Sequence, residues 1–168
     1  MTYRTRIDGD VAYLTLTKGY VAVIDVADAF AVGGYCWYAR TDGNTVYAGR
    51  QGQRDLNGKQ KTIRLHRFIL GVPDGVDVDH IDRNGLNNRR SNLRAATRAQ
   101  NARNCRLCVV NSSGFKGVSW HKANKKWCAN ISVHGRKKYI GSFTSKEAAY
   151  DAYCAASRDL HGEFGRTK

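Results

Sequence analysis

The chain has 168 residues, of which 42% are hydrophobic and only one is proline, so it can bury one ordinary core or two small ones and is not a disordered tail. Its 28 lysines and arginines outnumber its 14 aspartates and glutamates, which gives a formal net charge of +14. An excess of this size predicts a polyanionic partner, and nucleic acid is the first expectation.

A membrane surface is the alternative polyanion. The longest apolar run, residues 19–32, is interrupted by Asp25 and Asp28 and is too short to span a bilayer. The sequence offers no basic amphipathic helix with a broad apolar face. The first ten residues lack the apolar core of a signal peptide. We therefore expect a soluble, intracellular protein that binds no membrane.

The N-terminal region, residues 1–61, reads as β-structure. Its strand candidates are rich in Val, Tyr and Thr and cover residues 11–17, 20–26, 35–40 and 45–50. Asp42-Gly43-Asn44 is a hairpin signal, and Asn57-Gly58 predicts a further turn. Because no catalytic constellation is found here, we expect an antiparallel platform.

The middle of the chain is predicted to contain two short strands joined by a polar loop and followed by a helix. Residues 76–79 predict a short strand, a long loop rich in Asn and Arg follows, and residues 92–97 predict a second strand. Thr97 and Gln100 have the spacing of a capping box, which predicts the start of a helix. A strand, loop, strand and helix in this order can bring distant polar residues together.

Those polar residues suit phosphodiester hydrolysis, which needs a cation to absorb negative charge and a base to deprotonate water. Asp79 and Asn101 offer oxygen ligands for one divalent ion, Mg²⁺ or Mn²⁺, which keeps most of its waters. The unperturbed pKa of a histidine suits His80 as the general base near neutral pH, and Asn92 or a backbone carbonyl of the loop is expected to hold its ring. A solvated loop with an incidental histidine is the alternative.

Nearby arginines are expected to contact DNA phosphates, and these are Arg83, Arg89, Arg90, Arg94 and Arg98.

The segment VDHIDRNGLNNRRSNLRAATRAQN resembles the HNH nuclease motif of phage and intron-encoded HNH homing endonucleases, and the resemblance covers residues 62–104. It puts the first histidine at His80, the central asparagine at Asn92, the last motif position at Asn101 and the metal-binding aspartate at Asp79. The resemblance implies a ββα-metal fold with one bound divalent ion that nicks or cleaves DNA, in the cytoplasm of a bacterial host if the protein is phage-encoded. A non-catalytic DNA-binding regulator built on the same modules is the alternative.

Residues 105–113 read as a linker. Cys105 and Cys108 have the spacing of half a zinc site, but a closed site needs four ligands and no second pair follows. We therefore expect two ordinary thiols and no structural zinc. Five cysteines, an odd number, also argue against a disulfide framework.

The C-terminal part, residues 114–168, contains three short alternating runs at 114–121, 125–135 and 136–143. Thr144 and Glu147 have the capping-box spacing at the start of a helix, which Gly162 closes. The alanines of this helix, at positions 148, 149, 152, 155 and 156, predict a small-residue face against the sheet. This pattern predicts a three-stranded antiparallel sheet packed on one helix.

Alternation assigns the two faces of that sheet. Trp127, Ala129 and Ile131 are expected to face the helix. The opposite face is expected to contact DNA through Ser119, His121, Lys126, Asn130, Ser132, Lys137 and Tyr139. The elements KGV, KW.A.I, IG.F and EAAYDAY, in order over residues 114–162, resemble the plant ethylene-response-factor (APETALA-type) DNA-binding domain, which implies a sheet in the major groove. An ordinary solvated lysine surface is the alternative.

Together these features predict an α+β protein: an N-terminal antiparallel platform, a ββα-metal module over residues 62–104, and a C-terminal DNA-binding sheet. The predicted function is a metal-dependent DNA endonuclease that nicks one strand of double-stranded DNA, as a monomer or a weak dimer on the DNA.

Overall fold

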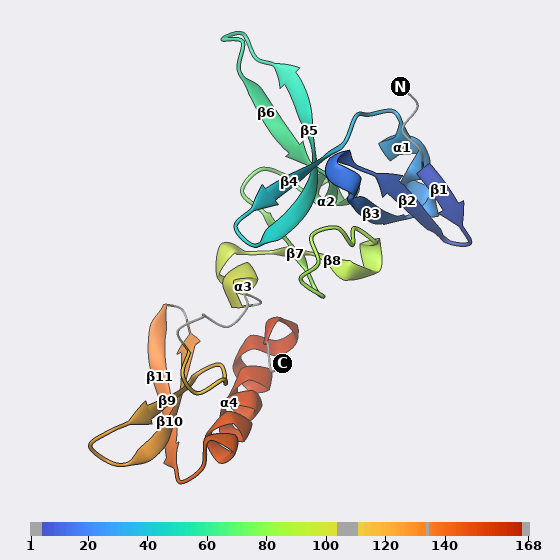
Figure 1. Ribbon diagram of the computed structural model, residues 1–168. Coiled ribbons are helices and arrows are strands. Elements are labelled where there is room, and N and C mark those ends of the chain that lie inside the picture. Colours follow the sequence, from blue (N-terminus) through green and yellow to red (C-terminus); the bar gives the residue numbers. More distant parts are fainter. Residues whose placement is uncertain (1–4, 104–110, 134, 166–168) are drawn as a thin grey trace. The chain divides into compact units, whose positions relative to one another are not determined.

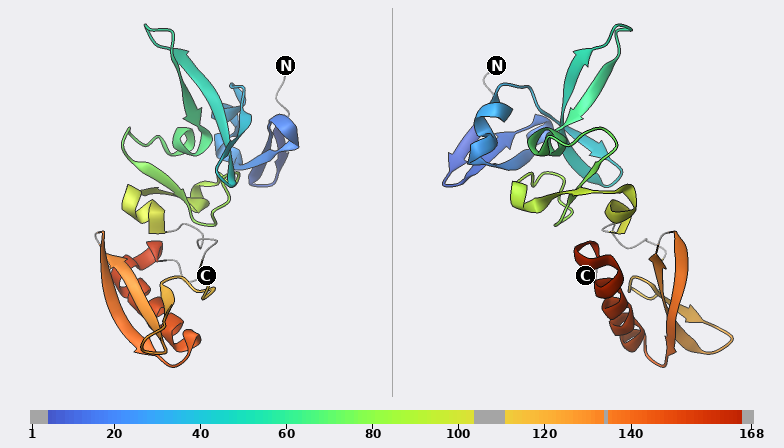
Figure 2. Two further views of the ribbon diagram at one scale, coloured as in Figure 1. Left: turned by 60° about the vertical axis from the view of Figure 1, so that its left-hand side comes forward. Right: turned by 180° about the vertical axis from the view of Figure 1, so that it is seen from behind.

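The computed structural model describes residues 5–103, 111–133 and 135–165, and the chain divides into two compact units at Thr97 and Arg98. Figures 1 and 2 show the elements of each unit. None of the helices in these ranges is long and apolar enough to cross a membrane.

The first unit begins with two three-stranded antiparallel sheets (Figure 1). The first, in the order β1-β2-β3, comprises β1 (Thr5–Asp8), β2 (Val11–Thr15) and β3 (Val21–Asp25). The second, in the order β4-β5-β6, comprises β4 (Tyr38–Asp42), β5 (Thr45–Arg54) and β6 (Gln60–Arg64). The 3-10 turn Thr17–Gly19 connects β2 to β3. The 3-10 turn Val26–Asp28 and helix α1 (Ala29–Gly33) lie between the two sheets in the chain, and helix α2 (Leu65–Leu70) follows β6.

Alternating side chains build the core of this unit. Leu14 and Ile24 are fully buried, and Trp37 joins them, with its indole nitrogen donating to the Val32 carbonyl at 2.9 Å. The predicted turn at residues 42–44 is confirmed, with Gly43 at φ +56° between β4 and β5. The prediction of strand over 35–37 is wrong, because β4 begins only at Tyr38.

A two-stranded antiparallel sheet completes the first unit: β7 (Asp77–His80) pairs with β8 (Leu93–Ala96). The loop between them docks on β3, where the Val23 N–H donates to the Leu86 carbonyl at 2.8 Å and the Asn88 N–H donates to the Val23 carbonyl at 2.7 Å. The loop ends in a 3-10 turn, Arg90–Asn92. Helix α3 (Arg98–Arg103) follows at the start of the second unit, so the predicted order of strand, loop, strand and helix is confirmed.

The second unit contains the antiparallel sheet β11-β10-β9, made of β9 (Val118–His121), β10 (Lys126–Val133) and β11 (Arg136–Phe143). Helix α4 (Lys146–His161) packs on it and ends in the 3-10 turn Gly162–Phe164. The buried side chains of its core are Val118, Ala129, Ile131, Ala149 and Tyr153. The α+β fold predicted from sequence is thus confirmed, including the sheet packed on one helix.

Two details of α4 differ from the prediction. Ser145, not Thr144, is the N-cap, and its Oγ accepts the Ala148 N–H at 3.1 Å. Only Thr144 has the Glu of a capping box three residues later, but the helix starts one residue further along, so Ser145 takes the N-cap position. Ala148 and Ala155 are exposed, so of the predicted alanine face Ala149 and Ala156 pack in the core, together with Tyr153.

Candidate functional site

Asp79 and His80 are the last two residues of β7, and both are buried, with 4% and 6% of their surface exposed. Arg94 lies opposite Asp79 in the β7–β8 register. Its Nε and Nη2 donate to Asp79 Oδ2 at 2.9 and 2.7 Å. Arg94 was predicted to contact a phosphate, whereas in the structure its guanidinium pairs with the carboxylate predicted to bind metal.

The ring of His80 is held from the loop. Its Nε2 lies 3.4 Å from Asn88 Oδ1, and because a carbonyl oxygen only accepts, Nε2 is the nitrogen that carries the hydrogen. The other nitrogen, Nδ1, is then the proton acceptor. Burial is the main cause that lowers the pKa of His80 below its ordinary value, while the Asn88 hydrogen bond opposes it. The ring is therefore neutral near pH 7.

Two rings of neighbouring elements pack against His80. His66, in α2, lies perpendicular to it with 5.0 Å between ring centroids, and Tyr47, in β5, lies 5.8 Å away. Burial, together with the charges of His80 and nearby arginines, lowers the pKa of His66 to about 3. His66 Nδ1 is buried without a hydrogen-bond partner, so this ring is a neutral packing element.

Asn92 organises the loop. Its Oδ1 accepts the Asp82 N–H at 3.0 Å, and its Nδ2 donates to Asp82 Oδ1 at 2.9 Å and to the Asn87 carbonyl at 2.8 Å. Asn92 or a backbone carbonyl was predicted to hold the His80 ring, but the hydrogen bond described above is donated by His80 Nε2 to Asn88 Oδ1. Asn88 was missed because one amide among several in a polar loop carries no local signal of burial, yet it is fully buried.

Two predicted phosphate-binding arginines connect this loop to the N-terminal region by ion pairs. Arg89 pairs with Asp25 through Nε at 2.7 Å and with Asp10 through Nη2. Arg90 binds Asp28 with both Nε and Nη2, at 3.0 and 2.7 Å. These acidic partners were not part of the prediction, and they give both guanidinium groups a structural task.

Asp25 lies at the centre of this connection. Burial alone raises its pKa, but the hydrogen bond from the Arg90 N–H at 2.8 Å and the adjacent Arg89 guanidinium outweigh burial, so the pKa lies below its ordinary value. The loop is thereby locked to β3 by charge as well as by backbone hydrogen bonds.

The loop also approaches β5 closely. A Cβ at Gly85 would lie 2.5 Å from the Val46 carbonyl oxygen and 2.6 Å from the Tyr47 ring, closer than atoms can approach. Only glycine fits there, and Tyr47 reaches the His80 ring from the same strand. Hairpin β4–β5 and the His80 centre are therefore packed as one piece.

The predicted metal ligands come from both units. Asp79 is in β7, whereas Asn101 is in α3 of the second unit, so their joint binding of an ion stays a prediction. Within the described ranges, no group of three or more His, Cys, Asp or Glu side chains gathers to hold a metal.

Two further predicted phosphate contacts, Arg83 and Arg98, lie in the loop and at the start of α3. Arg83 has φ +65°, and its N–H donates to the His80 carbonyl at 2.9 Å, which places its backbone next to the centre. Cys105 and Cys108 lie outside the described residues.

In the second unit, the residues predicted to face DNA lie on one side of the sheet. His121 pairs with Lys126, and Asn130 and Ser132 of β10 pair with Tyr139 and Lys137 of β11. Ser119, on β9, lies opposite Cys128 on the same face. Of this set only Asn130 is half-buried; the remaining side chains are exposed. The prediction that Trp127, Ala129 and Ile131 face the helix is confirmed.

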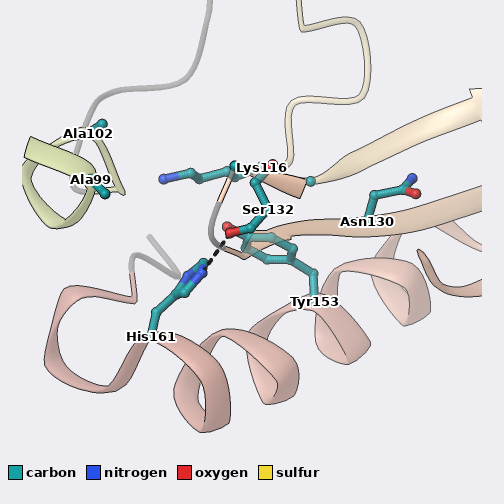
Figure 3. Close-up of a pocket in the computed structure, with 9 residues that line it drawn as sticks. Ala99, Ala102, Lys116, Asn130, Ser132, Tyr153 and His161 are labelled. Atoms are coloured by element: carbon teal, nitrogen blue, oxygen red, sulfur yellow. Dashed lines mark hydrogen bonds between the residues drawn. The ribbon is translucent and has the colours of Figure 1, made fainter. Parts of the chain in front are cut away.

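A pocket of about 350 Å³ opens beside this face (Figure 3). Asn130 and Ser132 line it together with Lys116, Tyr153 and His161. The His161 ring points to the end of β10, where Nε2 lies 3.0 Å from the Ser132 carbonyl oxygen. The hydrogen bond joins the end of α4 to the sheet that carries the predicted DNA-binding residues.

Comparison with known proteins adds three findings. The family model for HNH endonuclease matches residues 67–103. The chain is 35% identical over 163 residues to the uncharacterized HNH endonuclease L560 of Acanthamoeba polyphaga mimivirus, a match that covers 92% of this chain and 79% of that protein. It is 36% identical over 95 residues to protein 3.8 of Escherichia phage T7, covering 56% of this chain and 78% of that protein. No solved structure matches significantly.

Proposed function

The chain belongs to the HNH endonuclease family, and on this premise we propose that it is a metal-dependent enzyme of the homing type that nicks one strand of double-stranded DNA. The observation that carries the proposal is the pair at the end of β7: a carboxylate, Asp79, beside an imidazole, His80, whose ring is neutral and is oriented by the hydrogen bond from Nε2 to Asn88 Oδ1.

The proposed reaction is hydrolysis of a phosphodiester. Water forms a new bond to phosphorus, the bond from phosphorus to the leaving oxygen breaks, and His80 Nδ1 takes a proton from the water. His80 is 6% exposed, so only a small part of its ring is open to that water. Asn88 keeps the productive tautomer, and Asn92 keeps the loop that carries Asn88 in place.

HNH nucleases generally use a divalent metal ion, and we propose Mg²⁺ or Mn²⁺, one ion held by Asp79 and Asn101. When bound, such an ion stabilises negative charge on the phosphate and the leaving oxygen. Arg94 donates to Asp79 Oδ2, which orients the carboxylate, and its guanidinium charge partly balances that of the carboxylate. Few protein ligands and several waters match the preference of Mg²⁺ for oxygen.

The outer face of the second unit's sheet is proposed to choose the site on DNA, in the manner of an ethylene-response-factor-type domain. The exposed lysines and the hydrogen-bonding side chains there suit phosphates and base edges, respectively. Arg83 and Arg98 are proposed to add phosphate contacts. A single centre per chain suits cutting one strand per visit, by a monomer or a weak dimer on the DNA.

The test is a supercoiled plasmid incubated with Mg²⁺ or Mn²⁺ and three proteins: the natural chain, His80→Ala and, as a control outside the proposed site and DNA-binding sheet, Phe30→Ala, since Phe30 is 97% exposed on α1. We expect the natural chain and Phe30→Ala to produce open-circular plasmid without linear product, and His80→Ala to be slower by about 10²- to 10⁴-fold. Chelation should stop the reaction. DNA binding without cutting by all three proteins would instead support a non-catalytic DNA-binding regulator.

A further inference from the structure

The hairpin formed by β5 and β6 projects beyond the rest of the first unit (Figure 1), and both views of Figure 2 show the same projection. All residues from 53 to 61 are exposed. The segment has no role in the chemistry described above. An exposed β-ribbon of this kind either binds a partner or carries features, such as charged side chains, that prevent pairing with other chains.

The base of the hairpin is rigid. The Arg50 guanidinium lies 3.9 Å from the centroid of the Tyr35 ring, and the Trp37 and Phe68 rings lie 5.7 and 5.5 Å away. Gly52 lets the strands meet closely, since a Cβ there would lie 2.9 Å from the Lys61 carbonyl oxygen. The projecting part thus leaves the core from a fixed point.

The tip is also ordered. Asp55 Oδ1 accepts the N–H groups of Asn57 and Lys59 at 3.0 and 2.8 Å, and Gly58 takes φ +76° in the turn. This turn leaves Leu56 with a relative exposure of 106%, so a large apolar side chain stands alone at the end of the ribbon. A solvated turn needs no leucine at that position.

The flanks of the tip are basic. Arg54, Lys59 and Lys61 outnumber Asp55, the one acid of residues 53–61. Lys61 pairs with Asp74, but their side chains are 77% and 83% exposed, so water and salt screen the pair. Gln51, Gln53, Asn57 and Gln60 add side-chain amides that can hydrogen-bond to sugars and base edges.

We propose that this hairpin is a second DNA-binding arm, in addition to the sheet of the second unit. Its cations and amides follow a groove of duplex DNA, and Leu56 contacts the bases as an apolar wedge. A two-stranded ribbon fits a DNA groove, and apolar side chains at the tips of such arms unstack base steps. This inference rests on the proposed function, because it requires the chain to act on DNA.

The experiment measures binding of the full chain to a mixed-sequence duplex at several salt concentrations, with chelator present to prevent cutting. The variants are Leu56→Ala and the combined Arg54→Gln, Lys59→Gln and Lys61→Gln. Phe30→Ala is the matched control, because Phe30 is 97% exposed on α1, away from the hairpin. All of these positions are exposed, and equal thermal unfolding midpoints check that the variants fold.

We expect Leu56→Ala to weaken binding about tenfold if the side chain becomes buried against bases. The charge variant should reduce the slope of log affinity against log salt by about two to three. A 2-aminopurine base in the duplex should brighten with the natural chain and with Phe30→Ala, but not with Leu56→Ala.

Unchanged affinity and salt dependence in both hairpin variants would overturn the arm and leave the proposed nuclease intact. A natural chain that binds no DNA would overturn both. Binding of the natural chain to anionic lipid vesicles, lost in Leu56→Ala while DNA binding is unchanged, would assign the hairpin to a membrane surface instead.

Discussion

The two buried asparagines of the β7–β8 loop and the polar residues of the second unit's sheet have similar chemistry but opposite surroundings. Asn88 and Asn92 are buried, and their side-chain amides form hydrogen bonds with His80 and within the loop. Arg89 and Arg90 form ion pairs with Asp10, Asp25 and Asp28. The polar side chains on the sheet, such as Lys126 and Lys137, are exposed. Residue type alone therefore does not separate a side chain that builds a site from one that meets a ligand.

Among the substitutions that test this contrast, Asn92→Ala is expected to have the largest effect. It removes three hydrogen bonds from the inside of the loop, and we expect the free energy of unfolding of the first unit to fall by about 2–3 kcal/mol. Denaturant unfolding measures the change. Asn84→Ala is the control: Asn84 is exposed, and its side chain accepts only the Leu86 N–H, so a loss below about 1 kcal/mol is expected. Equal losses would contradict the assignment of Asn92 to loop structure.

Acid should destabilise the first unit through its buried histidines. Because the folded-state pKa of His66 is about 3 and its ordinary value is 6.5, the unfolded chain takes the proton first as the pH falls. Stability is then complete above about pH 6.5 and declines below it by about 1 kcal/mol per pH unit. Thermal unfolding from pH 7 to 4.5 measures the slope.

The slope should become smaller in His66→Gln, although that variant is less stable at neutral pH. His121→Gln, on the exposed sheet, should keep the natural slope. An unchanged slope in His66→Gln would mean that another group takes up the proton.

Ser145→Ala tests the corrected helix cap in the second unit. Loss of the Oγ acceptor for the Ala148 N–H should cost about 1 kcal/mol, seen as a lower unfolding midpoint of that unit. Thr144→Ala should change the midpoint far less. A larger loss of the unfolding midpoint in Thr144→Ala than in Ser145→Ala would instead support the capping box predicted at Thr144.

The smallest effect is expected from single lysines on the sheet. Lys137→Ala should weaken binding to all duplexes about equally and reduce the salt slope by about one, because an exposed lysine contacts phosphate without reading sequence. Fluorescence anisotropy at several salt concentrations measures both. A loss restricted to one DNA sequence would show base contact instead.

Local patterns predicted the elements well. Alternation found β10 and β11, and the Asp-Gly-Asn sequence at 42–44 found the hairpin turn. The short strand was predicted over residues 76–79, whereas β7 covers Asp77–His80, so the alternating run found the strand but ended it one residue before His80. Each of these depends on neighbours within a few residues.

The hydrogen bonds and ion pairs of the site could not be predicted from the sequence. The pairs of Arg89 with Asp10 and Asp25 join residues 79 and 64 positions apart, so only the folded sheets bring them together. The choice of Asn88 over Asn92 as the partner of His80 depends on how the loop docks on β3. Charge counting also does not show that Arg89, Arg90 and Arg94 each pair with an aspartate of the same chain.

The tight fit of Gly85 against Val46 and Tyr47 has a consequence for where the DNA is cut. Leu56 lies nine residues beyond Tyr47 along the chain, which is at most about 30 Å at the rise of a strand, or about nine base steps. Because Gly85 lets the loop pack closely on β5, the hairpin tip and the His80 imidazole are held at one distance from each other. If Leu56 acts as the proposed wedge, the length of the ribbon sets the number of nucleotides between the wedge and the cut, and lengthening β5 and β6 by two residues each should move the cut outward.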